Sequence, residues 1–199
     1  MTGIARGPAL FLDRDGVINT DHGYVHRVDQ FDFLPGIFEL ARFVAQDLRW
    51  PIVVVSNQSG IGRGLFDETA HVALTAWMCE RFREQQAPIA RAYHCPYHPE
   101  HGIGGYRRDH DWRKPKPGMI LQAAADLDLD LSRSVLIGDR LSDIEAAAAA
   151  GIPLRIRLDP LGAGPGPADP PHHVVRTLPE ALSILRDMQP LRAAGEGRG

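Results

Sequence analysis

Three short apolar segments of the chain each end in side chains that carry oxygen. ALFLD (residues 9–13) ends at Asp13, PIVVVS (51–56) ends at Ser56, and SVLIGD (134–139) ends at Asp139. Short apolar runs of this kind are typical of buried strands in parallel sheets, and PIVVVS is also dense in β-branched residues. Since ligands bind beyond the carboxyl ends of such strands, the pattern predicts that the three side chains meet in one crevice, although the segments are far apart in sequence.

Segments with helical periodicity alternate with the apolar runs. Further strands are predicted at 89–94, 153–158 and 172–177, and helices at 35–48, 67–86, 117–129, 141–151 and 178–188. Asp67 is a plausible N-cap, and Thr177 and Glu180 have the spacing of a capping box. This alternation predicts an α/β fold, a three-layer Rossmann-like open parallel sheet with helices on both faces.

Length and composition indicate one globular domain. We expect a single domain over residues 1–190, containing a Pro/Gly-rich linker at 159–171, followed by a flexible tail at 191–199. Apolar residues make up 44% of the chain and the net charge is -3, which gives no basic footprint for nucleic acid or an anionic membrane. No apolar run approaches the roughly 18 residues of a membrane span, and the N-terminal run reads as a strand, not a signal peptide. Two cysteines, Cys79 and Cys95, fit a reduced cytoplasmic setting.

The acids at the predicted strand ends indicate a metal site. Asp13 is followed by Asp15, and Asp139 by Asp143. Any one of these acids alone is more often an N-cap or a solvated loop residue. Four carboxylates in one crevice would repel each other and stay protonated unless a cation were present. Carboxylate and carbonyl oxygens favour a hard ion, and Mg²⁺ is the usual ion where a phosphate completes its coordination.

The same residue types can transfer a phosphoryl group. An aspartate such as Asp13 can attack phosphorus, and a second one, Asp15, can protonate the leaving oxygen and then activate water. Arg113 and Lys114 precede a predicted helix start, where a cation can neutralise charge on the transferring group, although an exposed basic turn is the plainer interpretation. The phosphate-binding pattern G-x-x-x-x-G-K-[ST] is absent from the sequence, which argues against nucleotide hydrolysis of that type.

Four motifs in order carry a family resemblance: DRDGVIN (13–19), SNQSGIGRG (56–64), RKPKPG (113–118) and GDRLSD (138–143). Together they resemble the haloacid dehalogenase superfamily of phosphatases. DRDGVINTDHGYV and SNQSGIGRG further resemble the branch of D-glycero-D-manno-heptose-1,7-bisphosphate 7-phosphatases, which is close to the histidinol-phosphate phosphatases. The resemblance runs from about residue 8 to residue 157, and it implies a fold without a large cap domain.

The resemblance implies roles for individual residues. Asp13 would be the nucleophile and a Mg²⁺ ligand, Asp15 the general acid/base and a ligand through its backbone carbonyl, and Asp139 the third ligand. Ser56 and Lys114 would hold the transferring phosphoryl group. Asp143 would not bind the ion directly but would orient a metal-bound water or Lys114. By similarity, the substrate contacts would be Asp21, His22, Gly23, Tyr24, Asn57, Gln58, Ser59, Arg113 and Arg140. A second phosphate could be met by Arg63, Arg107, Arg108 or Lys116, each of which taken alone is an ordinary surface charge.

The histidine-rich segment 94–112 is the family's loop for a structural zinc, with the pattern C-x-H, a spacer and C-x-C. Here only Cys95 keeps its place, and Tyr97, His110 and Trp112 stand at the other three positions. A rearranged set of Cys95, His98, His101 and His110 could still form a tetrahedral site. Because Tyr and Trp supply bulk in place of ligands, we expect a zinc-free loop packed by side chains that faces the substrate.

The resulting prediction is a Mg²⁺-dependent phosphatase that forms an aspartyl-phosphate and removes the 7-phosphate of heptose 1,7-bisphosphate, in nucleotide-heptose biosynthesis. It would act as a monomer on a small phosphorylated sugar, without nucleic acid or membrane. Histidinol-phosphate phosphatase, or a phosphatase of another small sugar phosphate, is the alternative within the same chemistry. A phospho-receiver domain is the alternative outside enzymes; Asp15 argues against it, because a second acid would hasten hydrolysis of the phosphoryl group. A non-catalytic sugar-phosphate binder is disfavoured because every catalytic position is filled.

Overall fold

The computed structural model describes residues 7–162, 164, 166 and 169–188 of the 199-residue chain. The predicted tail at 191–199 lies outside this part, as do residues 163, 165, 167 and 168 of the predicted linker. Strands are β1 (Leu10–Leu12), β2 (Ile52–Asn57), β3 (Ile89–Cys95), β4 (Val135–Gly138), β5 (Leu154–Leu158) and β6 (His173–Val175). Helices are α1 (Ile37–Arg42), α2 (Ser59–Gly62), α3 (Glu68–Glu84), α4 (Gly118–Leu127), α5 (Leu141–Ala149) and α6 (Leu178–Asp187).

The strands form one sheet in the order β3-β2-β1-β4-β5-β6, and every neighbouring pair is parallel. From β1 the chain runs outward through β2 to β3, and it then returns to place β4 on the other side of β1. The strand order therefore reverses between β1 and β4, and this switch point is where an open α/β sheet binds its ligand. The predicted α/β class with an open parallel sheet is confirmed.

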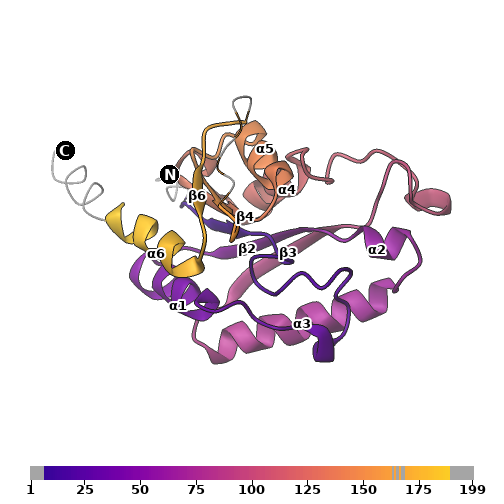
Figure 1. The fold of residues 1–199 in the computed structure, drawn as a ribbon, viewed down its shortest axis with the longest axis horizontal. Coiled ribbons are helices and arrows are strands. Elements are labelled where there is room, and N and C mark those ends of the chain that lie inside the picture. The colour runs from indigo at the N-terminus through magenta and orange to yellow at the C-terminus, as the bar shows by residue number, and fades with distance from the viewer. Residues whose placement is uncertain (1–6, 163, 165, 167–168, 189–199) are drawn as a thin grey trace, which may run out of the picture.

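Helices cover both faces of the sheet, as Figure 1 shows, with α1, α3 and α6 on one face and α4 and α5 on the other. Alternate residues of each strand point to opposite faces. Thus Leu10 and Leu12 join the core beneath α1, α3 and α6, whereas Phe11 joins the core beneath α4 and α5. Both cores consist of buried, mainly aliphatic and aromatic side chains, and each fully buried Val, Leu, Ile, Phe or Met stabilises the fold by about 1.5–3 kcal/mol.

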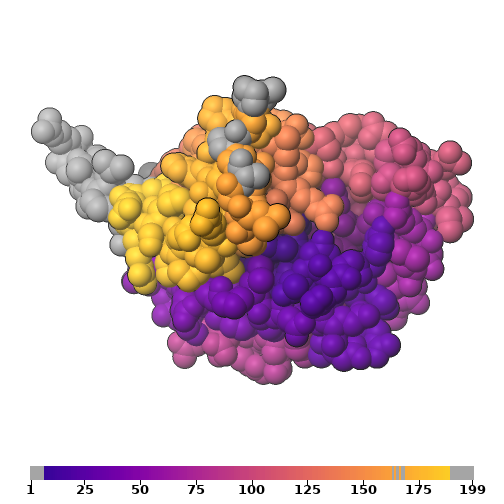
Figure 2. Space-filling model, viewed as in Figure 1, coloured from indigo at the N-terminus to yellow at the C-terminus, as the bar shows by residue number. Residues whose placement is uncertain are grey.

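The C-terminal segment completes one edge of the sheet. β6 pairs with β5, and α6 packs against α1, as the yellow and purple surfaces in Figure 2 show. Thr177 is the N-cap of α6, and its Oγ1 accepts the Glu180 N–H at 3.4 Å. The predicted capping box forms only in part, because the Glu180 carboxylate accepts the N–H of Arg176 at 2.9 Å and not that of Thr177. Within the described part of the chain, no helix has both the length and the apolarity to cross a bilayer.

Candidate active site

The switch point brings acids from two distant segments together. Asp13 follows β1 and Asp139 follows β4, and the backbone N–H of Asp13 donates to Ile137 O at 3.0 Å. One carboxylate oxygen from each of Asp13, Asp139 and Asp143 lies within 4.8 Å of the others. The convergence predicted from the apolar runs is therefore present, and Asp143 joins it from the first turn of α5.

Glycines make this approach possible. A Cβ on Gly16, whose φ is +85°, would lie 2.3 Å from Asp139 Oδ2. A Cβ on Gly138 would lie 2.2 Å from Asp143 Cβ. Both contacts are shorter than any side chain tolerates, so the absence of a side chain at these two positions lets the carboxylates reach the centre of the site.

Lys114 links the three segments through its ammonium group. Its Nζ lies 2.9 Å from Asp13 Oδ1 and 2.5 Å from Asp143 Oδ1, and it donates to Val55 O at 2.7 Å. The backbone of Lys114 is fixed by Asn57, whose side-chain amide accepts its N–H at 3.1 Å and donates to its carbonyl at 3.0 Å. Burial alone would lower the pKa of Lys114, but Asp13 and Asp143 raise it above its ordinary value, so the side chain stays charged.

The three acids carry more negative charge than Lys114 can balance. Burial raises the pKa of Asp13 to about 8, with Lys114 acting in the opposite direction and Asp143 and Asp139 adding to the rise. Burial, followed by Asp143, raises the pKa of Asp139 to about 6. Among the described residues, buried Asp139 Oδ1 has no hydrogen-bond partner. A hard divalent cation bound by these oxygens would neutralise the excess charge and satisfy that atom, so the residues fit Mg²⁺.

The Asp15 carboxylate is surrounded by hydrogen-bond donors and not by other acids. Its carboxylate accepts from Arg14 Nη2 at 2.9 and 2.8 Å, from Asn19 Nδ2 at 3.1 Å and from Gln58 Nε2 at 2.8 Å. Gln58 Nε2 also lies 2.7 Å from Ser56 Oγ. Asp15 is thus held by donors, beside the acids but outside their cluster.

Apart from Asp139, the acids of the site and Lys114 line a pocket of about 510 Å³. Most of the predicted site residues are among its lining: Asp13, Asp15, Asp21, Gly23, Tyr24, Ser56, Asn57, Gln58, Ser59, Arg113, Lys114, Arg140 and Asp143. Arg140 Nη2 pairs with Asp21 Oδ2 at 2.8 Å, which joins the loop after β1 to the start of α5. Gly60 and Ser142 also line the pocket, and the sequence reasoning missed both, although each stands inside a motif that it quoted.

One predicted substrate contact lies elsewhere. His22 is not part of the pocket lining, and its Nε2 contacts Asp32 Oδ2 at 2.8 Å on the surface. The four cations considered for a second phosphate are likewise outside the lining. Arg108 stacks at 4.0 Å over the Tyr97 ring, Lys116 pairs with Asp109 at 2.5 Å, and Arg63 contacts the hydroxyl of the pocket residue Tyr24.

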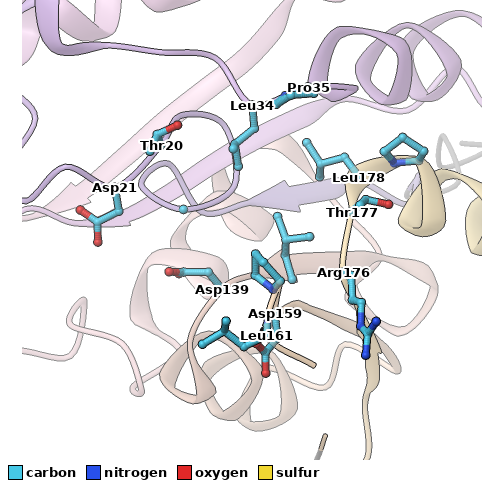
Figure 3. A pocket seen from close by; sticks show the side chains of 14 residues that line it. Thr20, Asp21, Leu34, Pro35, Asp139, Asp159, Leu161, Arg176, Thr177 and Leu178 are labelled. Carbon is cyan, nitrogen blue, oxygen red and sulfur yellow. Dashed lines mark hydrogen bonds between the residues drawn. The ribbon is translucent and has the colours of Figure 1, made fainter. Parts of the chain in front are cut away.

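A second, mostly apolar cavity of about 540 Å³ adjoins the first. Figure 3 shows Leu34 and Pro35 on one side, Leu178 and Arg176 on another, and Asp139 and Asp21 on the side away from Leu178. Its floor comes from the end of β5 and the start of α6. Asp21 lines both cavities, whereas Asp139 lines only the second one.

The four side chains of the alternative zinc set do not gather. Within the residues that the structure describes, the acid cluster around Asp13 is the only group of three or more metal-ligating side chains. His110 stacks on Tyr97 with ring centroids 4.4 Å apart, and His98 Nδ1 accepts the N–H groups of Glu100 and His101. The loop geometry therefore gives the zinc alternative no support.

Comparison with known proteins agrees with this site. The fold and its acids define a hydrolase of the haloacid dehalogenase type, and residues 111–156 match the HAD-hydrolase-like family model. The chain is 54% identical over 144 residues to D-glycero-alpha-D-manno-heptose-1,7-bisphosphate 7-phosphatase of Burkholderia mallei, covering 72% of this chain and 76% of the relative. It is 49% identical over 149 residues to D-glycero-beta-D-manno-heptose-1,7-bisphosphate 7-phosphatase of Vibrio cholerae, covering 75% and 80%. The chain belongs to this heptose-bisphosphate phosphatase family of haloacid dehalogenase-like enzymes.

Solved structures show the same architecture. A Mesorhizobium loti protein assigned as a HAD-like phosphatase superposes with a TM-score of 0.80 at 35% identity, covering 90% of this chain and 86% of the other. D,D-heptose 1,7-bisphosphate phosphatase from B. bronchiseptica, in complex with magnesium and phosphate, superposes with a TM-score of 0.76 at 30% identity, covering 91% and 99%. The predicted resemblance, fold and phosphatase class are therefore confirmed.

Proposed function

We propose that this phosphatase removes the 7-phosphate of D-glycero-D-manno-heptose 1,7-bisphosphate. One observation carries the proposal: Asp13, Asp15, Ser56 and Lys114 share one pocket in a chain whose relatives at 54% and 49% identity carry that activity in their names. The enzyme would act as a monomer in the cytoplasm, on a small phosphorylated sugar in nucleotide-heptose biosynthesis. Neither nucleic acid nor a membrane would take part.

In this proposal the phosphoryl group is transferred twice, first from the sugar to Asp13 and then from Asp13 to water. The Asp13 carboxylate attacks the phosphorus, and the bond from phosphorus to the sugar oxygen breaks while Asp15 donates a proton to that oxygen. Asp15 then takes a proton from water, the water oxygen attacks phosphorus, and Asp13 and inorganic phosphate are released. Ser56 and Lys114 hold the phosphoryl oxygens through both steps.

Mg²⁺ would be held by the carboxylates of Asp13 and Asp139 and by the backbone carbonyl of Asp15. When bound, the ion neutralises charge on the phosphoryl group. Asp143 acts through Lys114: its 2.5 Å contact fixes the ammonium beside Asp13, and its other oxygen accepts the Arg140 N–H at 3.0 Å. Asp21, Gly23, Tyr24, Asn57, Gln58, Ser59, Arg113 and Arg140 line the space where the sugar would bind.

The test measures phosphate release from both anomers of heptose 1,7-bisphosphate and from histidinol phosphate, with ³¹P NMR to identify which phosphate leaves. We expect loss of the 7-phosphate and a much higher kcat/KM for the heptose substrate. A higher kcat/KM for histidinol phosphate would overturn the proposal that heptose 1,7-bisphosphate is the substrate. Asp13→Asn should abolish turnover, and activity that survives this change would overturn the covalent mechanism.

A further inference from the structure

Arg14, between the nucleophile Asp13 and the acid/base Asp15, is buried. Its side chain is only 2% exposed, although it carries a charge that is costly to remove from water. Arg14 therefore needs strong compensation from its surroundings, and its partners indicate what it does.

Its guanidinium is committed to one carboxylate. Arg14 Nε lies 3.2 Å from Asp15 Oδ1, and Nη2 lies 2.9 Å from Oδ1 and 2.8 Å from Oδ2. Nη2 also donates to Val25 O at 2.6 Å. Among the described residues, Asp15 is the only acid that this guanidinium contacts, and a planar fork of this kind fixes the plane of a carboxylate.

The hydrogen bonds of Arg14 serve to orient Asp15 more than to stabilise the fold. Buried Arg14 Nη1 has no partner within the described residues, and the neighbouring His71 Nδ1 has none either. A group retained only for stability would be expected to use all its donors, since each buried, unpaired donor costs about 1–3 kcal/mol.

We propose that Arg14 is a positioning residue that fixes the Asp15 carboxylate for proton transfer to the leaving oxygen. Gln58 and Asn19 donate one hydrogen bond each to this carboxylate, whereas Arg14 contacts both of its oxygens from one rigid, planar group. The proposal rests on the proposed phosphatase mechanism but not on its particular sugar. Because Arg14 also gives its backbone N–H to Asp13 Oδ1 at 2.8 Å, a side-chain substitution leaves the contact to the nucleophile available.

Substrates with different leaving groups can distinguish a positioning role of Arg14 from a purely structural one. kcat/KM reports the steps up to departure of the leaving group. An alkyl phosphate needs a proton on its leaving oxygen, whereas p-nitrophenyl phosphate leaves as a stable anion and needs little help. Loss of Asp15 positioning should therefore harm the first substrate far more than the second.

The experiment compares Arg14→Met, Arg14→Lys and wild type on p-nitrophenyl phosphate and on any alkyl phosphate that the wild type hydrolyses. We expect Arg14→Met to lower kcat/KM roughly 10²-fold for the alkyl phosphate and less than about tenfold for the aryl phosphate, with partial recovery in Arg14→Lys. Arg157→Met, which removes a mostly buried arginine outside the pocket, should leave the ratio unchanged. Asp15→Asn, which removes the acid itself, shows the largest selective loss on the alkyl phosphate that any loss of Asp15 positioning could cause.

An equal loss on both substrates, or no loss on either, would overturn the proposal. If Arg14→Met does not fold, the ratio in Arg14→Lys decides in the same way. Failure of the wild type on heptose bisphosphate would count against the proposed substrate alone, because the ratio needs only some alkyl phosphate.

Discussion

At the scale of single residues, Lys114 organises the charges of the site. Its ammonium contacts Asp13, Asp143 and a strand carbonyl, so every hydrogen on Nζ has a protein oxygen within reach. The nucleophile and the group that neutralises the phosphoryl oxygens are thereby fixed before substrate binds, and such preorganisation is a main source of transition-state stabilisation.

His71 provides a prediction about pH and stability. Burial, followed by His94 and Arg14, lowers its pKa from 6.5 to about 3. Because His71 then binds fewer protons in the folded state than in the unfolded state, its contribution to the free energy of unfolding falls as pH drops below 6.5. From pH 7 to pH 5 this loss should amount to about 2 kcal/mol. Urea unfolding of His71→Phe should lack that part of the loss, and His101→Asn, a change at an exposed histidine, should retain it. Equal pH slopes in His71→Phe and wild type would contradict the prediction.

The sequence predicted residues at strand ends well and buried partners poorly. Asp13, Ser56 and Asp139 follow from apolar runs that end in oxygen-bearing side chains, because parallel strands bring such ends together. The commitment of Arg14 to Asp15 depends on burial that only the tertiary structure creates. His22, expected to contact the substrate, lies outside the pocket lining and contacts Asp32, so its role stays a prediction.

At the scale of elements, the β4–α5 turn depends on Gly138. In Gly138→Ala the new Cβ would lie 2.2 Å from Asp143 Cβ and 2.6 Å from Asp143 Oδ2, so Asp143 must move away from Lys114. We expect kcat to fall more than tenfold and the free energy of unfolding to fall by about 1–3 kcal/mol. Steady-state kinetics and urea unfolding measure the two effects. Gly105→Ala, where a Cβ meets nothing within 4 Å, is the matched control. Wild-type kcat in Gly138→Ala would contradict this account of the turn.

The loop 94–112 gives a second prediction at this scale. Tyr97 stacks on His110, and Trp112 packs edge-on against Tyr93 at 6.0 Å, so rings occupy three of the family's four zinc positions. Purified protein should contain far less than one equivalent of zinc. Activity lost on chelation should return fully with Mg²⁺ alone. One equivalent of zinc that resists dialysis would contradict the prediction.

Elements with strong patterns were predicted, and short ones were not. The helix predicted over 67–86, with Asp67 as its N-cap, matches α3 closely, and the weaker strand predicted over 89–94 matches β3, but α2 has four residues and no apolar period to reveal it. The helix predicted over 35–48 is α only over Ile37–Arg42 and continues as a π-helix over Phe43–Asp47. The hydrogen-bond register inside a continuous helix leaves little trace in the hydrophobic pattern.

At the scale of the whole molecule, the acid cluster couples folding to pH and Mg²⁺. Two halves of the sheet meet at the switch point, so the carboxylates are brought together only when β1 and β4 pair. Without a cation, the raised pKa values of Asp13, about 8, and Asp139, about 6, mean that the folded state holds protons which the unfolded state has released. This contribution to stability therefore falls as pH rises from about 4 to 8.

Mg²⁺ should reverse that trend. Binding requires ionised carboxylates, so protons compete with the ion, and the affinity for Mg²⁺ should rise by up to about tenfold per pH unit for each proton displaced. We therefore expect millimolar Mg²⁺ to raise Tm more at pH 8 than at pH 6, measured by calorimetry with and without the ion. Asp139→Asn should reduce the increase at both pH values, because one ligand and one competing proton are removed together. An increase in Tm equal at pH 6 and pH 8 would show that the ion does not bind through these acids.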